Sequence, residues 1–208
     1  MNNLFKRILS SILLITLLFY IIFFGSYTLF LFIFICFFVS IYEWYKMTKN
    51  KFLRYSGYLF LFFSFYTFYI ISFDLNLILF VMLICVSTDI GGYVFGKIFK
   101  GPKLIKISPK KTYSGMFGGY FLSFTNLVIV SNFTDKVEVS TYFFILVLII
   151  STISQIGDII ISYFKRLSKI KDTGKLIPGH GGILDRIDGM IFVFPIIFLI
   201  KLFGFINI

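Results

Sequence analysis

The sequence contains few of the residues from which many soluble enzymes build metal or redox sites. Of its 208 residues, only one is histidine and two are cysteine. Neither a histidine-rich metal centre nor a disulfide framework can therefore be built. Charged residues make up only 14% of the chain, about half of their usual share in a soluble domain. No polar stretch is long enough to form a second core, which excludes a soluble domain inserted between apolar segments.

Apolar residues dominate the rest of the sequence. Hydrophobic side chains make up 59% of it, and 31 residues are phenylalanine. Several apolar runs approach or exceed the roughly 18–20 residues that a helix needs to cross a bilayer. We therefore predict an all-α, polytopic integral membrane protein. The runs predict about seven transmembrane helices, near residues 8–24, 27–41, 58–73, 77–95, 120–130, 142–161 and 187–205.

The basic residues predict how these helices are oriented. With seven spans, every strongly basic segment falls on one side of the membrane: residues 6–7, 46–54, 97–111 and 165–175. Because loops rich in lysine and arginine stay in the cytoplasm, we expect the N-terminus there and the C-terminus outside. The net charge of +11 is spread over short clusters between apolar runs. This pattern favours contact with anionic lipid and argues against a nucleic-acid partner.

We predict two regions in the chain, with N-terminal membrane spans in residues 1–76 and the polar motifs in residues 77–208. The first apolar run resembles a signal peptide, but no small-residue cleavage site follows it, so we expect it to be retained as a span. Glu43 lies at the end of the second run, in an aromatic and basic border that continues to Arg54. Such borders are typical of the membrane–water interface.

Four aspartates stand out because acidic residues are rare here. Asp89 and Asp158 lie within predicted spans, where an ionisable group is costly and usually faces a bundle interior or a wet cavity. The alternative for each is a carboxylate near a helix end that reaches water. Asp185 and Asp188 are three residues apart, so on a helix they share one face. The alternative for this pair is a solvated helix start, stabilised by the helix dipole.

Three of these carboxylates are predicted to meet at one membrane boundary. Asp158 lies near the cytoplasmic end of one predicted span, and Asp185 and Asp188 lie at the cytoplasmic start of the next. Ligation by oxygen alone suits Mg²⁺. Four basic residues stand beside them: Lys165, Arg166, Lys169 and Lys171. Carboxylates together with dense cations are typical of a site for a metal-bound polyphosphate.

A glycine-rich loop precedes the helix of Asp185. Its residues are Pro178, Gly179, Gly181 and Gly182. Glycines let the backbone approach a ligand closely, and the N–H groups of a helix N-terminus can bind phosphate. The alternative is a simple turn. His180, within this loop, is more often a structural hydrogen-bonding residue than a catalyst.

A second basic segment, ISPKKTYSGMFGG, precedes the fifth predicted span. It places Lys110, Lys111 and Thr112 just before a glycine-flanked apolar helix. Lysines beside hydroxyl groups can bind a phosphate or an anionic lipid headgroup. A positive loop that only sets the topology explains these residues equally well.

The stretch SYFKRLSKIKDTGKLIPGHGGILDRID, residues 162–188, resembles the signature of the phosphatidate cytidylyltransferase (CDP-diacylglycerol synthase) family. That pattern is Ser-x-apolar-Lys-Arg, four spacers, Lys-Asp, then Pro-x-His-Gly-Gly and Asp-Arg-x-Asp, and every fixed position is met without a gap. The SPKKT segment and Asp89 also resemble the family, so the similarity covers roughly residues 85–190. One departure is Tyr113-Ser114, where the family usually has Trp-Glu.

The resemblance implies an enzyme that transfers a cytidylyl group from CTP to phosphatidic acid, giving CDP-diacylglycerol and pyrophosphate in phospholipid biosynthesis. It also implies Mg²⁺, as two divalent ions or as Mg²⁺ with K⁺. Members of that family are dimeric membrane enzymes, so the resemblance implies a homodimer in a bacterial-type inner membrane. The active site is then expected to face the cytoplasm.

The resemblance also implies roles for individual residues. Metal ligands are expected at Asp158, Asp185 and Asp188. The residues expected to carry the chemistry are Lys165, Arg166, Lys171, Asp172, Asp185, Arg186 and Asp188. Those expected to bind or shape the substrates are Ser162, His180, Gly181, Gly182, Lys110, Lys111 and Thr112.

Two other functions remain open at this point. A CDP-alcohol phosphotransferase also pairs aspartates at a membrane surface, but its second pair of acids has no counterpart in the apolar residues after DRIDGM. An ion or lipid transporter could use Asp89 and Asp158 as a coupling pair. It would predict paired broken helices and an internal repeat, which the sequence does not contain.

Overall fold

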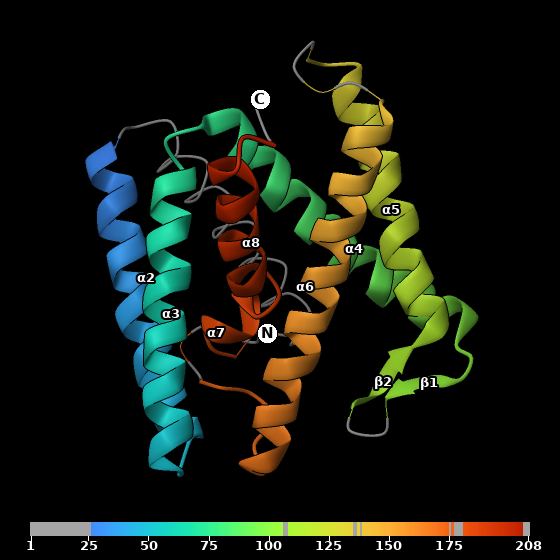
Figure 1. The fold of residues 1–208 in the computed structure, drawn as a ribbon. Coiled ribbons are helices and arrows are strands. Elements are labelled where there is room, and N and C mark those ends of the chain that lie inside the picture. The colour runs from blue at the N-terminus through green and yellow to red at the C-terminus, as the bar shows by residue number, and fades with distance from the viewer. Residues whose placement is uncertain are drawn as a thin grey trace, which may run out of the picture. The chain divides into compact units, whose positions relative to one another are not determined.

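The computed structural model describes residues 26–105, 108–134, 137, 139–174, 176 and 181–205. Several sequence predictions lie outside these residues: the span at 8–24, Lys6, Arg7, Pro178, Gly179 and His180. The chain divides into two compact units, each made of two separate segments (Figure 1). The first unit comprises Met1–Ile70 and Phe164–Asp188, and the second comprises Ile71–Tyr163 and Gly189–Ile208.

Helices make up most of the described structure. The first unit contains α2 (Ser26–Met47), α3 (Lys51–Ile71), the end of α6 (Thr141–Leu167) and the short α7 (Leu184–Ile187). The second unit contains α4 (Leu75–Phe99), β1 (Lys103–Ile105), β2 (Ser108–Thr112), α5 (Tyr113–Ser131), most of α6 and α8 (Met190–Leu202). The predicted helical class is confirmed.

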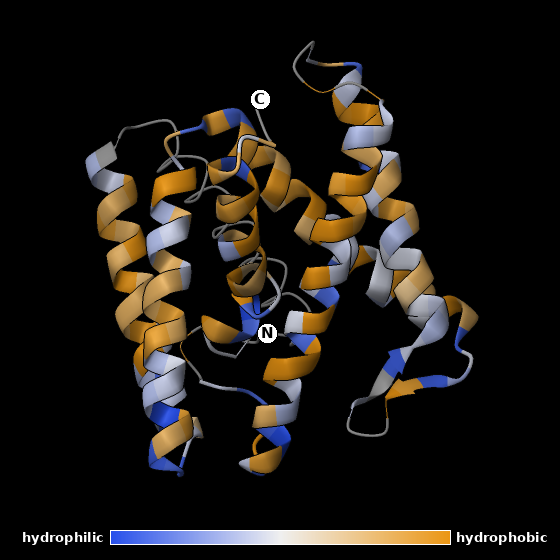
Figure 2. Cartoon of the chain, in the orientation of Figure 1, coloured by the Kyte–Doolittle hydropathy of each residue, from blue (hydrophilic) through white to orange (hydrophobic). Residues whose placement is uncertain are grey.

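Within the described residues, four helices are long and apolar enough to cross a membrane. They are α2, α4, α5 and α6. The predicted third and last spans correspond to α3 and to the 13-residue α8, which are not among these four. Figure 2 shows hydrophobic residues along most of each long helix, with hydrophilic residues gathered near helix ends and in the hairpin. An apolar helical membrane protein is therefore confirmed, whereas the count of seven spans stays a prediction.

Several helices extend beyond the apolar runs that predicted them. α5 begins at Tyr113 instead of near residue 120, because the Thr112 hydroxyl accepts a hydrogen bond from the Gly115 N–H at 3.1 Å and caps the first turn. α6 continues to Leu167 and so carries Lys165 on its last turn. Apolar composition identifies the part of a helix in lipid, but polar residues at its ends are equally helical.

The basic segment before α5 contains a feature that the sequence did not predict. Strands β1 and β2 form a two-stranded antiparallel hairpin, in which Lys103 pairs with Thr112 and Ile105 with Ser108. This pairing was not predicted from the sequence, because lysine and proline are uncommon in strands. The hairpin leads directly into α5 and sets where Lys111 and Thr112 lie.

Glycines bring α4 and α5 close together in the second unit. A methyl group added at Gly91 would lie 2.3 Å from the carbonyl oxygen of Gly118, and one at Gly118 would lie 2.2 Å from Cβ of Phe95. Small residues at helix contacts are typical of membrane proteins, in which close backbone packing replaces the hydrophobic effect. The hydroxyl of Thr88 adds hydrogen-bond contacts with Ser123 of α5 and Ser151 of α6, at 2.8 and 3.0 Å.

This packing predicts different effects of alanine at two adjacent glycines. Gly91→Ala should lower the free energy of unfolding by about 1–3 kcal/mol, because the methyl group has no space between the backbones. Gly92→Ala is the matched control, since its added carbon would lie 3.7 Å from its nearest neighbour, an ordinary contact. Thermal unfolding in detergent measures both variants. Equal stability of the two variants would contradict this account of the α4–α5 contact.

Candidate functional site

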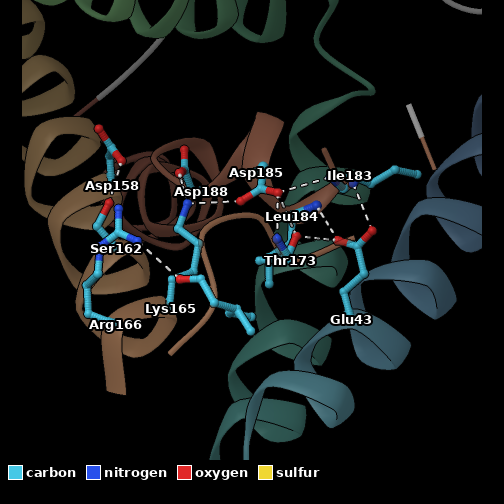
Figure 3. Close-up of polar contacts among 12 residues, drawn as sticks. Glu43, Asp158, Ser162, Lys165, Arg166, Thr173, Ile183, Leu184, Asp185 and Asp188 are labelled. Atoms are coloured by element: carbon cyan, nitrogen blue, oxygen red, sulfur yellow. Dashed lines mark hydrogen bonds and ion pairs between the residues drawn. The ribbon is translucent and has the colours of Figure 1, made fainter. Parts of the chain in front are cut away.

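A buried lysine lies between two aspartates in the first unit. Lys165 Nζ is 2.9 Å from Asp185 Oδ1 and 3.6 Å from Asp188 Oδ2 (Figure 3). Lys165 comes from the last turn of α6, Asp185 from α7, and Asp188 from the turn that follows. The side chains of the lysine and the two aspartates are only 11%, 6% and 12% exposed. The predicted common face of the two aspartates is confirmed, because one ammonium group contacts both.

Asp185 is held by hydrogen bonds as well as by this lysine. Its Oδ2 atom accepts from the Thr173 N–H at 2.7 Å, the Thr173 hydroxyl at 3.0 Å and the Gly182 N–H at 3.0 Å. Burial acts to raise the pKa of Asp185, but the Gly182 N–H, the Lys165 ammonium and the Thr173 N–H together hold that pKa below its ordinary value. Asp185 is therefore a carboxylate at neutral pH, and its Oδ1 atom faces the lysine.

Glu43 is a third carboxylate at this site, and the sequence reasoning missed it. It lies on α2, is 2% exposed, and accepts hydrogen bonds from the N–H groups of Ile183 and Leu184 at 3.0 and 2.8 Å. It also accepts a hydrogen bond from the Thr173 hydroxyl at 2.9 Å (Figure 3). The one sequence signal for it is a carboxylate directly after a long apolar run, in the predicted membrane border.

The glycines around this site pack against the protein's own carboxylates. A carbon added at Gly182 would lie 2.4 Å from both carboxylate oxygens of Glu43, and one added at Gly174 would lie 2.5 Å from Glu43 Oε1. Gly181 has a φ of +90°, and a carbon there would lie 2.7 Å from Asp185 Oδ2. Close approach to the two acids therefore explains these glycines. Contact of Gly181 and Gly182 with a substrate stays a prediction.

The second unit contains another predicted pair of site residues. Lys111 Nζ lies 2.6 Å from Asp158 Oδ2, and their side chains are 21% and 33% exposed. The Ser162 hydroxyl donates to Asp158 Oδ1 at 3.3 Å. The hairpin and α6 thus bring together three residues that the sequence singled out separately. The side chain of Lys110 and all of His180 lie outside the described residues.

The remaining predicted site residues are exposed. They are Arg166, Lys171, Asp172 and Arg186 around the buried cluster, and Asp89 on α4. Arg166 donates to the carbonyl oxygen of Ile170 at 3.2 Å. Exposed cations beside a buried acidic cluster are placed to attract phosphate groups, although the structure assigns them no further role.

A cation at the buried cluster stays a prediction. In the part of the chain that the structure describes, no group of three or more His, Cys, Asp or Glu side chains has the arrangement of a metal site. However, Mg²⁺ commonly takes one or two carboxylates and completes its shell with water and phosphate oxygens. Asp185 Oδ1 and Asp188 Oδ2 both contact Lys165 in this structure, so Mg²⁺ binding by these two aspartates stays a prediction. A shared site that includes Asp158 stays a prediction.

Known proteins resemble this chain over much of its length. Phosphatidate cytidylyltransferase from Rickettsia conorii is 41% identical over 140 residues, which cover 62% of this chain and 60% of that protein. The protein of the same name from Staphylococcus epidermidis is 42% identical over 125 residues, which cover 59% of this chain and 48% of that protein. The chain thus spans about half to three-fifths of the length of these curated relatives.

The family comparison covers more of the sequence. A model described as the Cytidylyltransferase family matches residues 5–77 and 70–203, which include every candidate site residue named above. The resemblance of residues 162–188 to the cytidylyltransferase signature is therefore confirmed. The chain belongs to the cytidylyltransferase family.

Proposed function

We propose that this protein transfers a cytidylyl group from CTP to phosphatidic acid, releasing pyrophosphate and forming CDP-diacylglycerol. The observation that carries the proposal is the buried lysine between two aspartates, Lys165 between Asp185 and Asp188, within the family's motif. The names of the relatives and the apolar helices support a nucleotide substrate and a membrane lipid substrate.

The reaction is an in-line displacement at the α-phosphorus of CTP. A phosphate oxygen of phosphatidic acid forms the new P–O bond, while the bond from the α-phosphorus to the bridging oxygen of the β-phosphate breaks. Lys165 would supply positive charge to the phosphates from its place between Asp185 and Asp188. The exposed Arg166, Lys171 and Arg186 attract the triphosphate. Positioning and charge stabilisation supply the rate enhancement, without a covalent enzyme intermediate.

A divalent cation belongs to this proposal. Asp185 and Asp188 would hold Mg²⁺, with Asp158 contributing to a second ion, either Mg²⁺ or K⁺. When bound, the metal would offset the negative charge that develops on the phosphate groups. In the first unit one ammonium group contacts two aspartates, and Glu43 is a third buried carboxylate, joined to Asp185 through Thr173. A bound cation would offset the negative charge that the single lysine leaves.

The membrane arrangement and the oligomer are further parts of the proposal. The charge bias of the basic segments supports seven spans with the N-terminus in the cytoplasm. The active site would then face the cytoplasm at a bacterial-type inner membrane, where CTP is available. A homodimer is proposed from the family resemblance alone.

The proposed reaction can be tested directly with the purified chain. With CTP, Mg²⁺ and phosphatidic acid in mixed micelles, we expect stoichiometric release of pyrophosphate and formation of CDP-diacylglycerol. Omission of Mg²⁺ or addition of a chelator should stop the reaction. If neither product forms while a known cytidylyltransferase is active under the same conditions, the proposed function is wrong.

Removing one charge at the buried cluster should abolish most of the activity. Asp185→Asn and Asp188→Asn should each lower kcat by about 100-fold or more, because each removes a metal ligand and a partner of Lys165. Asp74→Asn is the matched control, since Asp74 caps α4 and pairs with Lys201 at 2.7 Å, and has no role in the proposed site. Turnover is measured on samples with equal folded fractions. Near-normal turnover in either cluster variant would contradict the metal assignment.

The hairpin lysine should affect nucleotide binding. Lys111→Gln should raise the KM for CTP by about 10-fold, because it removes a phosphate-binding cation and the ion pair of Asp158. Lys103→Gln is the matched control, since Lys103 is an exposed lysine on β1 of the same hairpin. Steady-state kinetics at saturating phosphatidic acid measure both. Equal KM values in the two variants would exclude a specific role for Lys111.

A further inference from the structure

Glu43 is buried without a cationic partner among the described residues. Its carboxylate, on α2, receives the N–H groups of Ile183 and Leu184 and the hydroxyl of Thr173. No ion pair to it is found in the described part of the chain. A buried carboxylate is costly unless strong hydrogen bonds compensate for its lost water. Its three donors all come from the segment that carries Asp185. Glu43 therefore holds a loop that lies 130 or more residues further along the chain.

Thr173 connects Glu43 to Asp185. Its hydroxyl oxygen lies 2.9 Å from Glu43 Oε2 and 3.0 Å from Asp185 Oδ2. A hydroxyl group has one proton to donate, so the two carboxylates share a single donor at this point. The Thr173 N–H also donates to Asp185, which holds the residue in place between the two acids. The position of Asp185 therefore depends on where Glu43 holds Thr173.

The glycines show how closely the loop is fitted to Glu43. Carbons added at Gly174 and Gly182 would each lie within 2.5 Å of its carboxylate oxygens. These two glycines flank the loop on its two sides, and the Gly182 N–H also donates to Asp185. The backbone thus lies against Glu43 at Gly174 and at Gly182. The same backbone supplies the N–H groups of Thr173 and Gly182 that orient Asp185.

We propose that Glu43 is a positioning residue that sets the geometry of Asp185 for the cation and phosphate chemistry of the site. This inference rests on the proposed function, because it assigns Glu43 a role in aiming that aspartate. Glu43 itself contacts neither substrate in this proposal. It acts through the Ile183 and Leu184 N–H groups, which begin the helical turn of Asp185, and through Thr173.

Glu43→Gln is the first test, because glutamine keeps the size but presents an NH₂ group to donors that need an acceptor. Hydrogen–deuterium exchange reads out the loop without any substrate. We expect the amides of Ile183 and Leu184 to exchange about 10- to 100-fold faster in the variant. Unchanged exchange at these two amides would overturn the proposal.

The kinetic test separates positioning from simple stability. Glu43→Gln should raise the Mg²⁺ concentration for half-maximal activity by about 10- to 100-fold, as loss of a residue behind a metal ligand does. Glu43→Asp, which keeps the charge, should recover part of this effect. Asp74→Asn is again the control, since it removes a carboxylate charge elsewhere and should leave the Mg²⁺ dependence unchanged. If Glu43 had a purely structural role, Glu43→Gln and Glu43→Asp would lower the folded fraction but leave the Mg²⁺ dependence unchanged. That result would overturn the proposal.

Thr173 supplies a second route if Glu43→Gln does not fold. Thr173→Val removes the shared hydroxyl but keeps Glu43 and the backbone bonds, and should shift the Mg²⁺ dependence in the same direction by a smaller factor. Thr173→Ser retains the hydroxyl and should lie nearer to the wild type. Equal shifts in the two variants would overturn the coupling between Glu43 and Asp185. If the wild-type chain forms no CDP-diacylglycerol, the proposed function fails, while the exchange experiment still decides whether Glu43 holds the loop.

Discussion

The site depends on one electrostatic constraint: three acids are buried, and the one buried lysine contacts only two of them. Lys165 contacts Asp185 and Asp188, and Glu43 is joined to Asp185 through Thr173. Ionised groups away from water persist only when hydrogen bonds and opposite charges compensate for their desolvation. The loop before α7 compensates the buried acids with hydrogen bonds from its backbone N–H groups. These bonds need the backbone to lie close to the carboxylates, which explains the glycines of the loop.

This constraint explains why distant segments of a mostly apolar chain meet at the site. α2 brings Glu43, the last turn of α6 brings Lys165, and the loop before α7 brings the donors. In lipid, apolar side chains alone give little preference for one helix partner over another. Polar contacts of this kind provide specificity that apolar surfaces lack. In the second unit, close glycine contacts and shared hydroxyl groups have the same effect between α4 and α5.

The sequence predicted the helical membrane class and the residues of the buried cluster, but not how that cluster is supported. Apolar runs located the helices because lipid demands them, and the three-residue spacing of Asp185 and Asp188 placed both on one face. Glu43 was missed because its donors include backbone N–H groups more than 100 residues away. Such partners cannot be recognised from the residues around Glu43 in the sequence. The β1–β2 hairpin was missed for a similar reason, since strand pairing depends on partners and not on local composition alone.

We propose that the two aspartates beside Lys165 form a cation site that acts together with CTP. Electron paramagnetic resonance of Mn²⁺, used in place of Mg²⁺ with the purified chain and CTP, tests it most directly. The account predicts bound Mn²⁺ with magnetic coupling to the phosphorus nuclei of CTP, and loss of that signal in Asp188→Asn. Bound Mn²⁺ with the same coupling in Asp188→Asn and Asp185→Asn would contradict the claim.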